Sequence, residues 1–387
     1  MPDSLKAALA IVPSVLCASL AFFVSFGISG SLRVNLGAGL LAFGVCLWFV
    51  MRHSRRRVVI TIAGTLCLLA LVSSPMAIDG LRGRPAPDSD VLVQQIGRAA
   101  VPLQSVDAGT GFTDLAPLAI TWQGVRVVAL GEATEGTSEF VRMKHRLVEF
   151  LVTQTGFRSI ATDLNEDDAR LIDNYAQGKG GVNPVRDLSW PWRTAEMAAM
   201  VDWMRKYNAG VPAADCVHFY GIDFQGQRRD FHLAQNTLGL LERLGAESRV
   251  ILWMHNAHVS SGPGWMGWYL KHQLRNQIYL TGFEFHHGSF TSSLNWVRTY
   301  EAEPAGVGYY AAALERTGKP ILFLDFRTMR EDPALAAWLE QPGYAHEMEE
   351  GYGLLRLNPG WTRTDESWPS LFDGIVYIEQ STPARLL

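Results

Sequence analysis

The stretch "VRVVALGEATEGTSEF", residues 125–140, carries the strongest fold signal in the chain. Its apolar run ends at Leu130, and Gly131 permits a turn before residues with helical spacing begin. The pattern predicts a buried strand followed by a helix, with Glu132 and Glu135 on the loop between them. A purely structural interpretation, in which both carboxylates only cap and solvate the helix, fits this spacing equally well.

The same alternation of apolar runs and helical segments continues along the chain. Further short apolar runs bounded by turn residues occupy residues 158–164, 216–223, 248–255, 277–285, 320–327 and 374–380. Strands that alternate with helices predict an α/β fold with a mostly parallel sheet and helices on both faces. Ligands of such sheets bind beyond the carboxyl ends of the strands, so polar residues at those ends are the site candidates.

The first 80 residues differ in composition from the rest. No charged residue occurs between Lys6 and Arg33, between Arg33 and Arg52, or between Arg57 and Asp79. Each gap is close to the roughly 20 residues that a helix needs to cross a bilayer. The pattern predicts a membrane anchor over residues 1–79, with three transmembrane helices at about residues 7–30, 34–51 and 58–78.

The loop between the second and third predicted spans, residues 52–57, reads "RHSRRR" and is expected to stay cytoplasmic. Arg82 and Arg84, just past the third span, favour the opposite orientation. With the first orientation the protein is a multi-pass protein of the inner (cytoplasmic) membrane with the lipid bilayer as a partner. A linker over residues 80–90 would then lead to an extracytoplasmic α/β domain over residues 91–387.

Composition and motifs exclude several classes of protein. The 387 residues carry a net charge of only −4, and the basic residues form no stripe, so nucleic acid is not an expected partner. Cys216 is the one cysteine after the predicted anchor, which rules out a disulfide framework or cysteine zinc site in the domain. The phosphate-binding and dinucleotide-binding glycine motifs and the serine-hydrolase elbow do not occur.

A second group of candidate residues follows the apolar run in "VILWMHNAHVS", residues 250–260. His255 and His258 lie three residues apart after this run, and Asp163 closes another one. Acids and histidines that converge from strand ends fit general acid–base hydrolysis. They fit a divalent metal held by carboxylate and imidazole groups as well, and the residues alone leave both alternatives open.

An aromatic segment, "LSWPWRTAEMAAMVDWMRKYN", occupies residues 188–208. Most of its apolar residues repeat at helical spacing, which indicates packing of a helix face. Trp190, Trp192 and Arg193 precede that helix, so they are candidates to line a pocket for a large apolar or sugar-bearing substrate.

Eight motifs in order give the chain, from about residue 125 to 381, a resemblance to the erythromycin esterase family: "ALGEATEGTSEF", "KHRLVEFLV", "WPWRTAEM", "FYGIDFQ", "WMHNAHV", "MGWYL", "LDFR" and "FDGIVYI". The resemblance implies an α/β enzyme with a helical lid region that hydrolyses esters, in the named members the lactone ring of macrolide antibiotics. Glu132, His255 and His258 match family positions directly, and Arg193 matches a recurrent arginine.

Two positions depart from the family pattern. Glu135 stands where the family has a histidine base, and Asp163 stands where it has a glutamate. Three alternatives follow. Glu135 acts as the base, or the pocket only binds a glycan or lipid intermediate of the envelope without catalysis, or the site is a metal centre formed by Glu132, Glu135, Asp163, His255 and His258.

The first alternative is the expectation we adopt, namely a membrane-anchored hydrolase that cleaves a small-molecule or envelope-polysaccharide ester or lactone without a cofactor. Glu135, assisted by His255 or His258, would deprotonate a water molecule that attacks the carbonyl carbon directly. Glu132 and Asp163 would orient the histidines or the water, and Arg193 would polarise the carbonyl oxygen.

Overall fold

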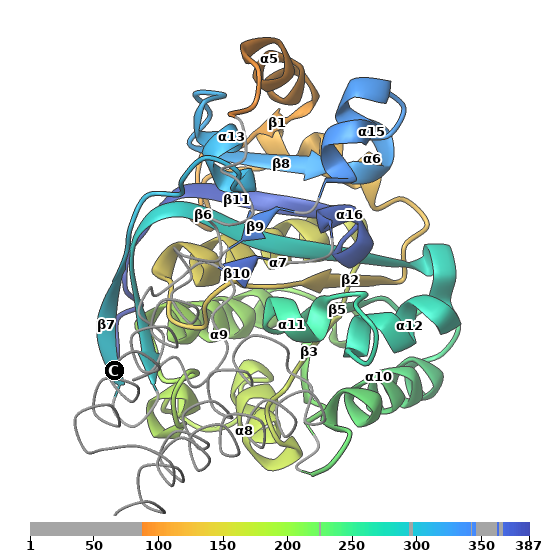
Figure 1. The fold of residues 1–387 in the computed structure, drawn as a ribbon. Coiled ribbons are helices and arrows are strands. Elements are labelled where there is room, and N and C mark those ends of the chain that lie inside the picture. Colours follow the sequence, from red (N-terminus) through yellow and green to blue (C-terminus); the bar gives the residue numbers. More distant parts are fainter. Residues whose placement is uncertain (1–86, 224–225, 294–296, 342, 346–361, 364–366) are drawn as a thin grey trace, which may run out of the picture. The chain divides into compact units, whose positions relative to one another are not determined.

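A mixed sheet forms the centre of the fold in the computed structural model, which describes residues 87–387 except 224–225, 294–296, 342, 346–361 and 364–366 (Figure 1). Those residues belong to one compact unit, Ala86–Leu387. Across the described part of the chain, the order of the strands is β1 (Val101–Pro102), β8 (Ile321–Asp325), β11 (Gly374–Ser381), β6 (Ile278–Ser293), β2 (Val127–Leu130), β5 (Val250–Trp253), β3 (Ser159–Thr162) and β4 (His218–Gly221), and β7 (Val297–Ala302) pairs with β6.

The direction of the strands changes across the sheet. Strands β4, β3, β5, β2, β6 and β11 run parallel to one another, whereas β8 is antiparallel to β11, β1 to β8 and β7 to β6. The expected mostly parallel sheet is therefore corrected to a mixed sheet. The sequence pattern could not reveal the direction of β8, because this strand is almost wholly buried. A strand buried on both faces is apolar throughout, whether it pairs in parallel or antiparallel.

Helices cover both faces of the sheet, because successive residues of the central strands point to opposite sides. Val128 and Leu130 of β2 belong to a core with α7 (Ser138–Thr155) and α9 (Ala195–Ala209). Val127 and Ala129 belong to a second core with α10 (Arg229–Leu244) and α12 (Met266–Leu274). The loops at the carboxyl ends of β2, β3 and β5 are thus held between two packed layers.

The remaining described elements are short and lie around this frame. They include α8 (Glu166–Ala176), whose first turn is capped by the Asn165 side chain, and α11 (Asn256–Val259), capped by His255. The others are α5 (Asp90–Ala99), α6 (Ala116–Thr121), α13 (Tyr310–Glu315), α14 (Phe326–Met329), α15 (Pro333–Leu339), α16 (Trp368–Leu371), four 3₁₀ turns (Thr113–Leu115, Pro184–Asp187, Ala213–Asp215, Arg275–Gln277) and a two-stranded sheet of β9 (Tyr344–Ala345) and β10 (Thr362–Arg363).

The predicted transmembrane helices at about residues 7–30, 34–51 and 58–78 lie outside the described residues. Within the described ranges, no helix combines the length and apolar character that crossing a membrane requires. The predicted fold class is corrected to an α/β domain with a mixed sheet, and nothing in the described residues supports the three transmembrane helices. Their prediction rested on the length and lack of charge of three segments, which a membrane span needs but which do not establish one.

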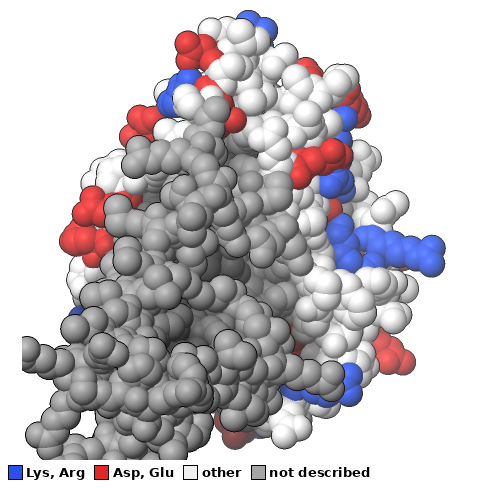
Figure 2. Space-filling model, in the orientation of Figure 1, with Lys and Arg blue, Asp and Glu red and all other residues white. Residues whose placement is uncertain are grey.

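On the face shown in Figure 2, acidic and basic side chains of the described residues are interspersed rather than separated into patches. This part of the surface carries no continuous basic stripe among those residues.

Candidate active site

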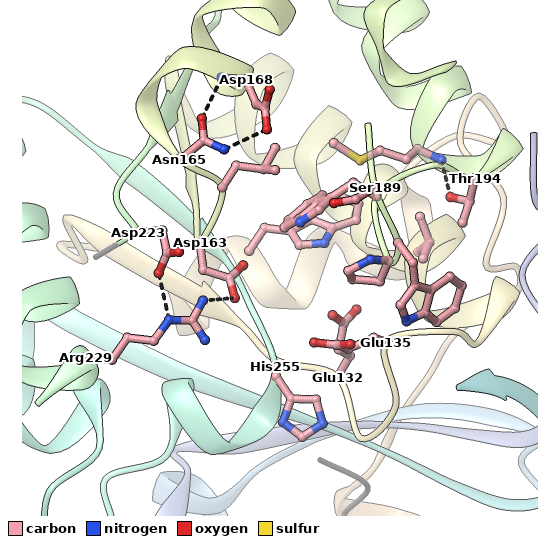
Figure 3. A pocket seen from close by; sticks show the side chains of 17 residues that line it. Glu132, Glu135, Asp163, Asn165, Asp168, Ser189, Thr194, Asp223, Arg229 and His255 are labelled. Atoms are coloured by element: carbon pink, nitrogen blue, oxygen red, sulfur yellow. Dashed lines mark hydrogen bonds and ion pairs between the residues drawn. The ribbon is translucent and has the colours of Figure 1, made fainter. Parts of the chain in front are cut away.

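A pocket of about 330 Å³ lies at the carboxyl ends of β2, β3 and β5 (Figure 3). The loop after β2 contributes Glu132 and Glu135, the end of β3 leads to Asp163, and β5 is followed by His255. In Figure 3 the three carboxylates point into the pocket. The other lining residues are Val141, Leu164, Asn165, Asp168, Ser189, Trp190, Pro191, Trp192, Thr194, Met197, Asp223, Arg229 and Trp253.

The loop that carries the two glutamates is fixed by close backbone contacts. A Cβ atom at Gly136 would overlap the carbonyl group of Thr291, and one at Gly131 would overlap the side chain of Asn256. The backbone N–H of Asn256 donates to the backbone carbonyl oxygen of Glu132 at 2.9 Å. The two glycines therefore let the loop approach the neighbouring chain closely, which sets where the glutamate side chains begin.

Beneath the pocket lies a buried ion pair between Lys144 of α7 and Glu132. Lys144 is fully buried, and its Nζ donates to Glu132 Oε2 at 2.8 Å and to the Met254 carbonyl oxygen at 3.1 Å. The ammonium also lies 4.9 Å from the ring centroid of Trp253. Lys144 therefore lies beside Glu132, one of several carboxylates that line the pocket.

Lys144 also interacts electrostatically with the other two acids, Asp163 and Glu135. Burial raises the pKa of Glu132, and the charge of Lys144 opposes that shift. Burial lowers the pKa of Lys144, while the charges of Glu132, Asp163 and Glu135 favour its protonated form. Lys144 is thus the shared counter-charge of three carboxylates that come from two strand ends.

His255 lines the pocket, but its ring is bound to the backbone. Its Nδ1 accepts from the Ala257 amide at 3.2 Å, and its Nε2 lies 3.3 Å from the Ala133 carbonyl oxygen, so the bonding assigns the ring proton to Nε2. In this position His255 ties the loop after β2 to the start of α11.

His258 lies outside the lining of the pocket, directly behind Asp163. Its Nδ1 is 2.8 Å from Asp230 Oδ1, and its Nε2 is 3.9 Å from Asp163 Oδ2 and 3.4 Å from Arg229 Nη1. Burial lowers the pKa of His258, but the hydrogen bond with Asp230 and the charges of Asp163 and Asp230 outweigh burial, so the pKa is raised overall.

Only some residues of the aromatic segment, residues 188–208, line the pocket. Trp190 and Trp192 line it, whereas Arg193 is exposed and is not among the lining residues. The guanidinium in the pocket is that of Arg229, whose Nε lies 2.7 Å from Asp223 Oδ1 and whose Nη2 lies 3.4 Å from Asp163 Oδ2. The structure therefore brings Glu132, Glu135, Asp163, His255, Trp190 and Trp192 together and leaves Arg193 outside.

Sequence reasoning overlooked Lys144, Arg229 and Asp230. Lys144 had a detectable signal, because it lies on the same helix face as Phe140 and Leu147 in an otherwise apolar stripe, where a charge needs a partner. Arg229 and Asp230 lie at the start of a helix, and nothing local distinguishes them from solvent-exposed residues.

The donor groups of the pocket have partners other than a metal. The Glu132 carboxylate accepts from Lys144, and both ring nitrogens of His255 face backbone groups. In the part of the chain that the structure describes, no group of three His, Cys, Asp or Glu residues has a geometry that could hold a metal ion.

The family model described as erythromycin esterase matches residues 152–228 and 224–381. An Escherichia coli protein named erythromycin esterase type II is 28% identical over 124 residues, which are 32% of this chain and 29% of that protein. A putative hydrolase of Bacillus subtilis (strain 168), YbfO, is 25% identical over 179 residues, 43% of this chain and 37% of that protein. The matches therefore span about a third of these relatives' length.

Solved structures share the fold at low identity. A protein from Bacillus cereus superposes with a TM-score of 0.70 at 19% identity, covering 78% of this chain and 100% of its own. A succinoglycan biosynthesis protein gives 0.68 at 21% identity, with 77% and 98% covered. An erythromycin esterase mutant in its open conformation gives 0.54 at 12% identity, with 71% and 95% covered.

Proposed function

Because the chain belongs to the erythromycin esterase family, we propose that it is a hydrolase that cleaves an ester or lactone in the pocket at the ends of β2, β3 and β5. The observation that carries the proposal is the set of three carboxylates, Glu132, Glu135 and Asp163, around one buried cation. Such a cluster places proton acceptors beside a fixed positive charge, which suits activation of a water molecule.

Glu135 is the proposed proton acceptor. It is half-buried, lines the pocket and interacts with the charge of Lys144, which donates a hydrogen bond to Glu132. A water molecule bound to Glu135 would attack the substrate carbonyl carbon, and the proton that Glu135 takes up would pass to the leaving alcohol oxygen. Addition of the water forms the new C–O bond and turns the carbonyl oxygen into an oxyanion. When this tetrahedral species collapses, the ester C–O bond breaks and the alcohol leaves with the proton, so no covalent enzyme intermediate is needed.

Arg229, rather than Arg193, is the proposed group that stabilises the developing oxyanion. Arg229 is the guanidinium that lines the pocket, and its contacts with Asp223 and Asp163 hold it in place. A preorganised donor of this kind stabilises a negative oxygen more in the transition state than in the ground state. Arg193 is exposed and is not among the residues that line the pocket.

The side chains suffice for the proposed chemistry without a cofactor. The position next to Glu132 that a metal ion would need is taken by the ammonium of Lys144, 2.8 Å away. A second cation there would be repelled at short range. We therefore propose a mechanism in which Lys144 supplies the positive charge that a metal supplies in other hydrolases.

The pocket restricts the class of substrate. Glu132, Glu135, Asp163, Asp168 and Asp223 line it, whereas Arg229 is the one lysine or arginine in its lining among the described residues. An ester that carries its own carboxylate or phosphate would therefore be repelled. Trp190 and Trp192 offer flat apolar surface next to these acids. A volume of about 330 Å³ admits the ester-bearing part of a larger molecule, so uncharged lactones and acylated sugars are the proposed substrates.

The test is turnover of an uncharged ester by the purified full-length protein. A panel of aryl esters, macrocyclic and small lactones, and acylated sugars is incubated with the wild type, with and without chelator. The proposal predicts release of acid from at least one compound at a rate that chelator does not change. Hydrolysis that disappears with chelator and returns with a divalent metal would contradict the metal-free mechanism.

One observation favours a second candidate, a protein that binds an ester or glycan without cleaving it. This chain has Glu135 where its resemblance to the family implies a histidine base. If Glu135→His hydrolyses compounds from the panel and the wild type hydrolyses none, the binding function is supported and the hydrolase proposal fails.

A further inference from the structure

A chain of ionisable side chains runs from α10 to the wall of the pocket. The Asp230 carboxylate accepts from the Met266 backbone amide at 2.9 Å and lies 2.8 Å from His258 Nδ1 with the same oxygen, Oδ1. Met266 is the first residue of α12, and His258 belongs to α11. Asp230 therefore connects α10 to α11 through the His258 ring and to α12 through the Met266 amide. Asp230 does not line the pocket itself.

The orientation of His258 decides which nitrogen faces the substrate side. Because Asp230 engages Nδ1, Nε2 is directed toward Asp163 Oδ2, at 3.9 Å, and toward Arg229 Nη1, at 3.4 Å. Arg229 in turn lies 3.4 Å from the same oxygen of Asp163. The order of groups is thus Asp230, His258, and then the Asp163–Arg229 pair in the pocket wall.

We propose that Asp230 is a positioning residue that aims Nε2 of His258 at Asp163, so that His258 and Arg229 together face the Asp163 carboxylate in the pocket wall. The activity readout of this inference rests on the proposed hydrolase function, whereas the state of His258 can be observed without it.

The surroundings of His258 fit this role. Asp230 faces it from α10 and Asp163 from the end of β3, so the ring lies between two carboxylates. The opposing positive charge is Arg229 of α10, and the neighbouring group on the loop before α12 is the uncharged ring of Trp265, 6.1 Å away and edge-on. Nε2 can accept from Arg229 only when the ring is neutral, whereas in the protonated ring Nε2–H can donate toward Asp163. Two acids against one cation favour the protonated imidazole.

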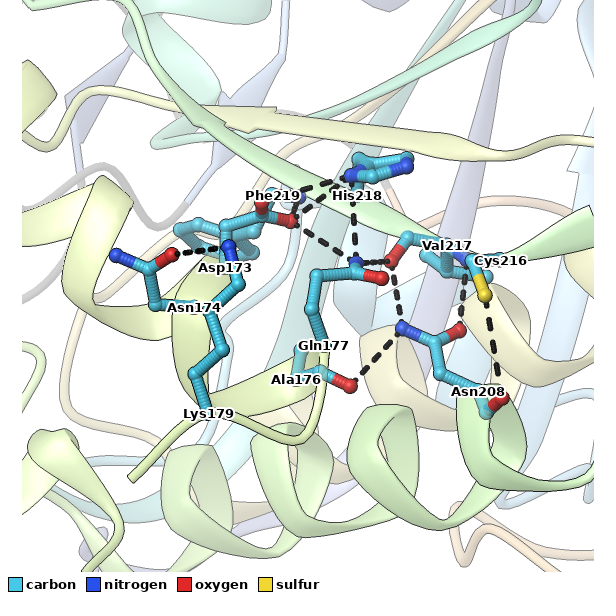
Figure 4. Close-up of polar contacts among 10 residues, drawn as sticks. All are labelled: Asp173, Asn174, Ala176, Gln177, Lys179, Asn208, Cys216, Val217, His218 and Phe219. Atoms are coloured by element: carbon cyan, nitrogen blue, oxygen red, sulfur yellow. Dashed lines mark hydrogen bonds and ion pairs between the residues drawn. The ribbon is translucent and has the colours of Figure 1, made fainter. Parts of the chain in front are cut away.

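A second histidine–aspartate pair in the same domain offers a matched control (Figure 4). Asp173 of α8 lies 3.2 Å from His218 Nδ1 on β4, and this hydrogen bond is the main cause that raises the pKa of His218. Asp173 also accepts from the Phe219 amide at 3.0 Å, much as Asp230 accepts from a backbone amide. Neither member of this pair lines the pocket.

The experiment compares Asp230→Asn with Asp173→Asn in the full-length protein. The pKa of each histidine is read from its imidazole carbon signals by NMR, and kcat/KM for a panel ester is measured from pH 5 to 9. In Asp230→Asn, where an amide keeps the acceptor for Met266 but removes the charge, the pKa of His258 should fall. The alkaline limb of kcat/KM should move to lower pH with it, and kcat/KM at pH 7.5 should drop about three- to tenfold.

In Asp173→Asn, only the His218 titration should move. Asp230→Glu, which keeps the charge, should keep the His258 pKa and restore the pH profile, and it also serves if Asp230→Asn does not fold. An unchanged His258 titration in Asp230→Asn, or the same shift of the pH profile in Asp173→Asn, would overturn the inference. If the wild type hydrolyses nothing, the proposed function fails, and the His258 titration alone then decides this inference.

Discussion

Replacement of Lys144 by methionine probes the buried charge on which the site is built. Lys144 is fully buried and 2.8 Å from Glu132, whose side chain is 10% exposed. At an effective dielectric constant of about 20, two charges at this distance attract by about 6 kcal/mol before the cost of burying them is subtracted. Removal of one partner of a buried pair destabilises proteins by about 3–5 kcal/mol, which is the loss expected for Lys144→Met near pH 8.

The pH dependence distinguishes this cause from simple repacking. Without Lys144, the folded-state pKa of Glu132 rises further above its unfolded value, because the burial that already raises it is no longer opposed. The folded state then binds more protons than the unfolded state, so the free energy of unfolding falls as pH rises from the unfolded pKa through the folded one. The loss in Lys144→Met should therefore be smaller at pH 5 than at pH 8.

The assay is urea denaturation at both pH values, with Glu132→Gln and the double variant as controls. Glu132→Gln leaves a buried lysine, so its loss should instead shrink as pH rises and Lys144 becomes neutral. The double variant should recover most of the stability, because it leaves no buried charge unpaired. A loss below about 1 kcal/mol in Lys144→Met, or one that is the same at pH 5 and pH 8, would refute the assigned ion pair.

Three further outcomes test other parts of the site. Arg229→Ala should lower kcat for a panel ester by about 10²–10³-fold, the usual effect of losing an oxyanion donor, whereas equal losses in Arg193→Ala would assign the role to Arg193. A neutral ester should have a kcat/KM about tenfold above that of a matched ester bearing a carboxylate, because a repulsion of about 1.4 kcal/mol corresponds to a factor of ten. Equal values would contradict the proposed repulsion of anionic esters by the pocket. Gly136→Ala should lower the free energy of unfolding by about 1–3 kcal/mol, because the added methyl group would overlap the Thr291 carbonyl. A melting temperature equal to that of the wild type would contradict this close contact.

The sequence predicted the elements that carry the site better than the contacts within it. Glu132 and Glu135 were placed on a strand-to-helix loop, and the structure has them after β2 and before α7. Local pattern suffices there, because an apolar run, a glycine and a helical repeat occur in one continuous stretch. Pairing direction is not local, and the buried run of β8 therefore did not reveal that it is antiparallel to β11.

The contacts that the sequence could not supply join residues distant along the chain. Lys144 meets Glu132 across a helix turn and a loop, and Arg229 reaches Asp163 from 66 residues away. His258 was expected beside His255 at one centre, yet one ring binds backbone groups and the other lies behind Asp163. Spacing along a strand end shows which residues are near the pocket, whereas the direction of each side chain depends on the packing of the helices around them.

The role of Glu135 is tested by kcat/KM for an uncharged ester in the wild type, Glu135→Gln and Glu166→Gln. Glu166 is an exposed glutamate at the start of α8 that is not itself a lining residue, so Glu166→Gln makes the same chemical change outside the pocket. The account predicts a loss of about 10²–10⁴-fold in Glu135→Gln, the usual contribution of a general base, and none in Glu166→Gln. Wild-type activity in Glu135→Gln would contradict the claim that Glu135 activates the water.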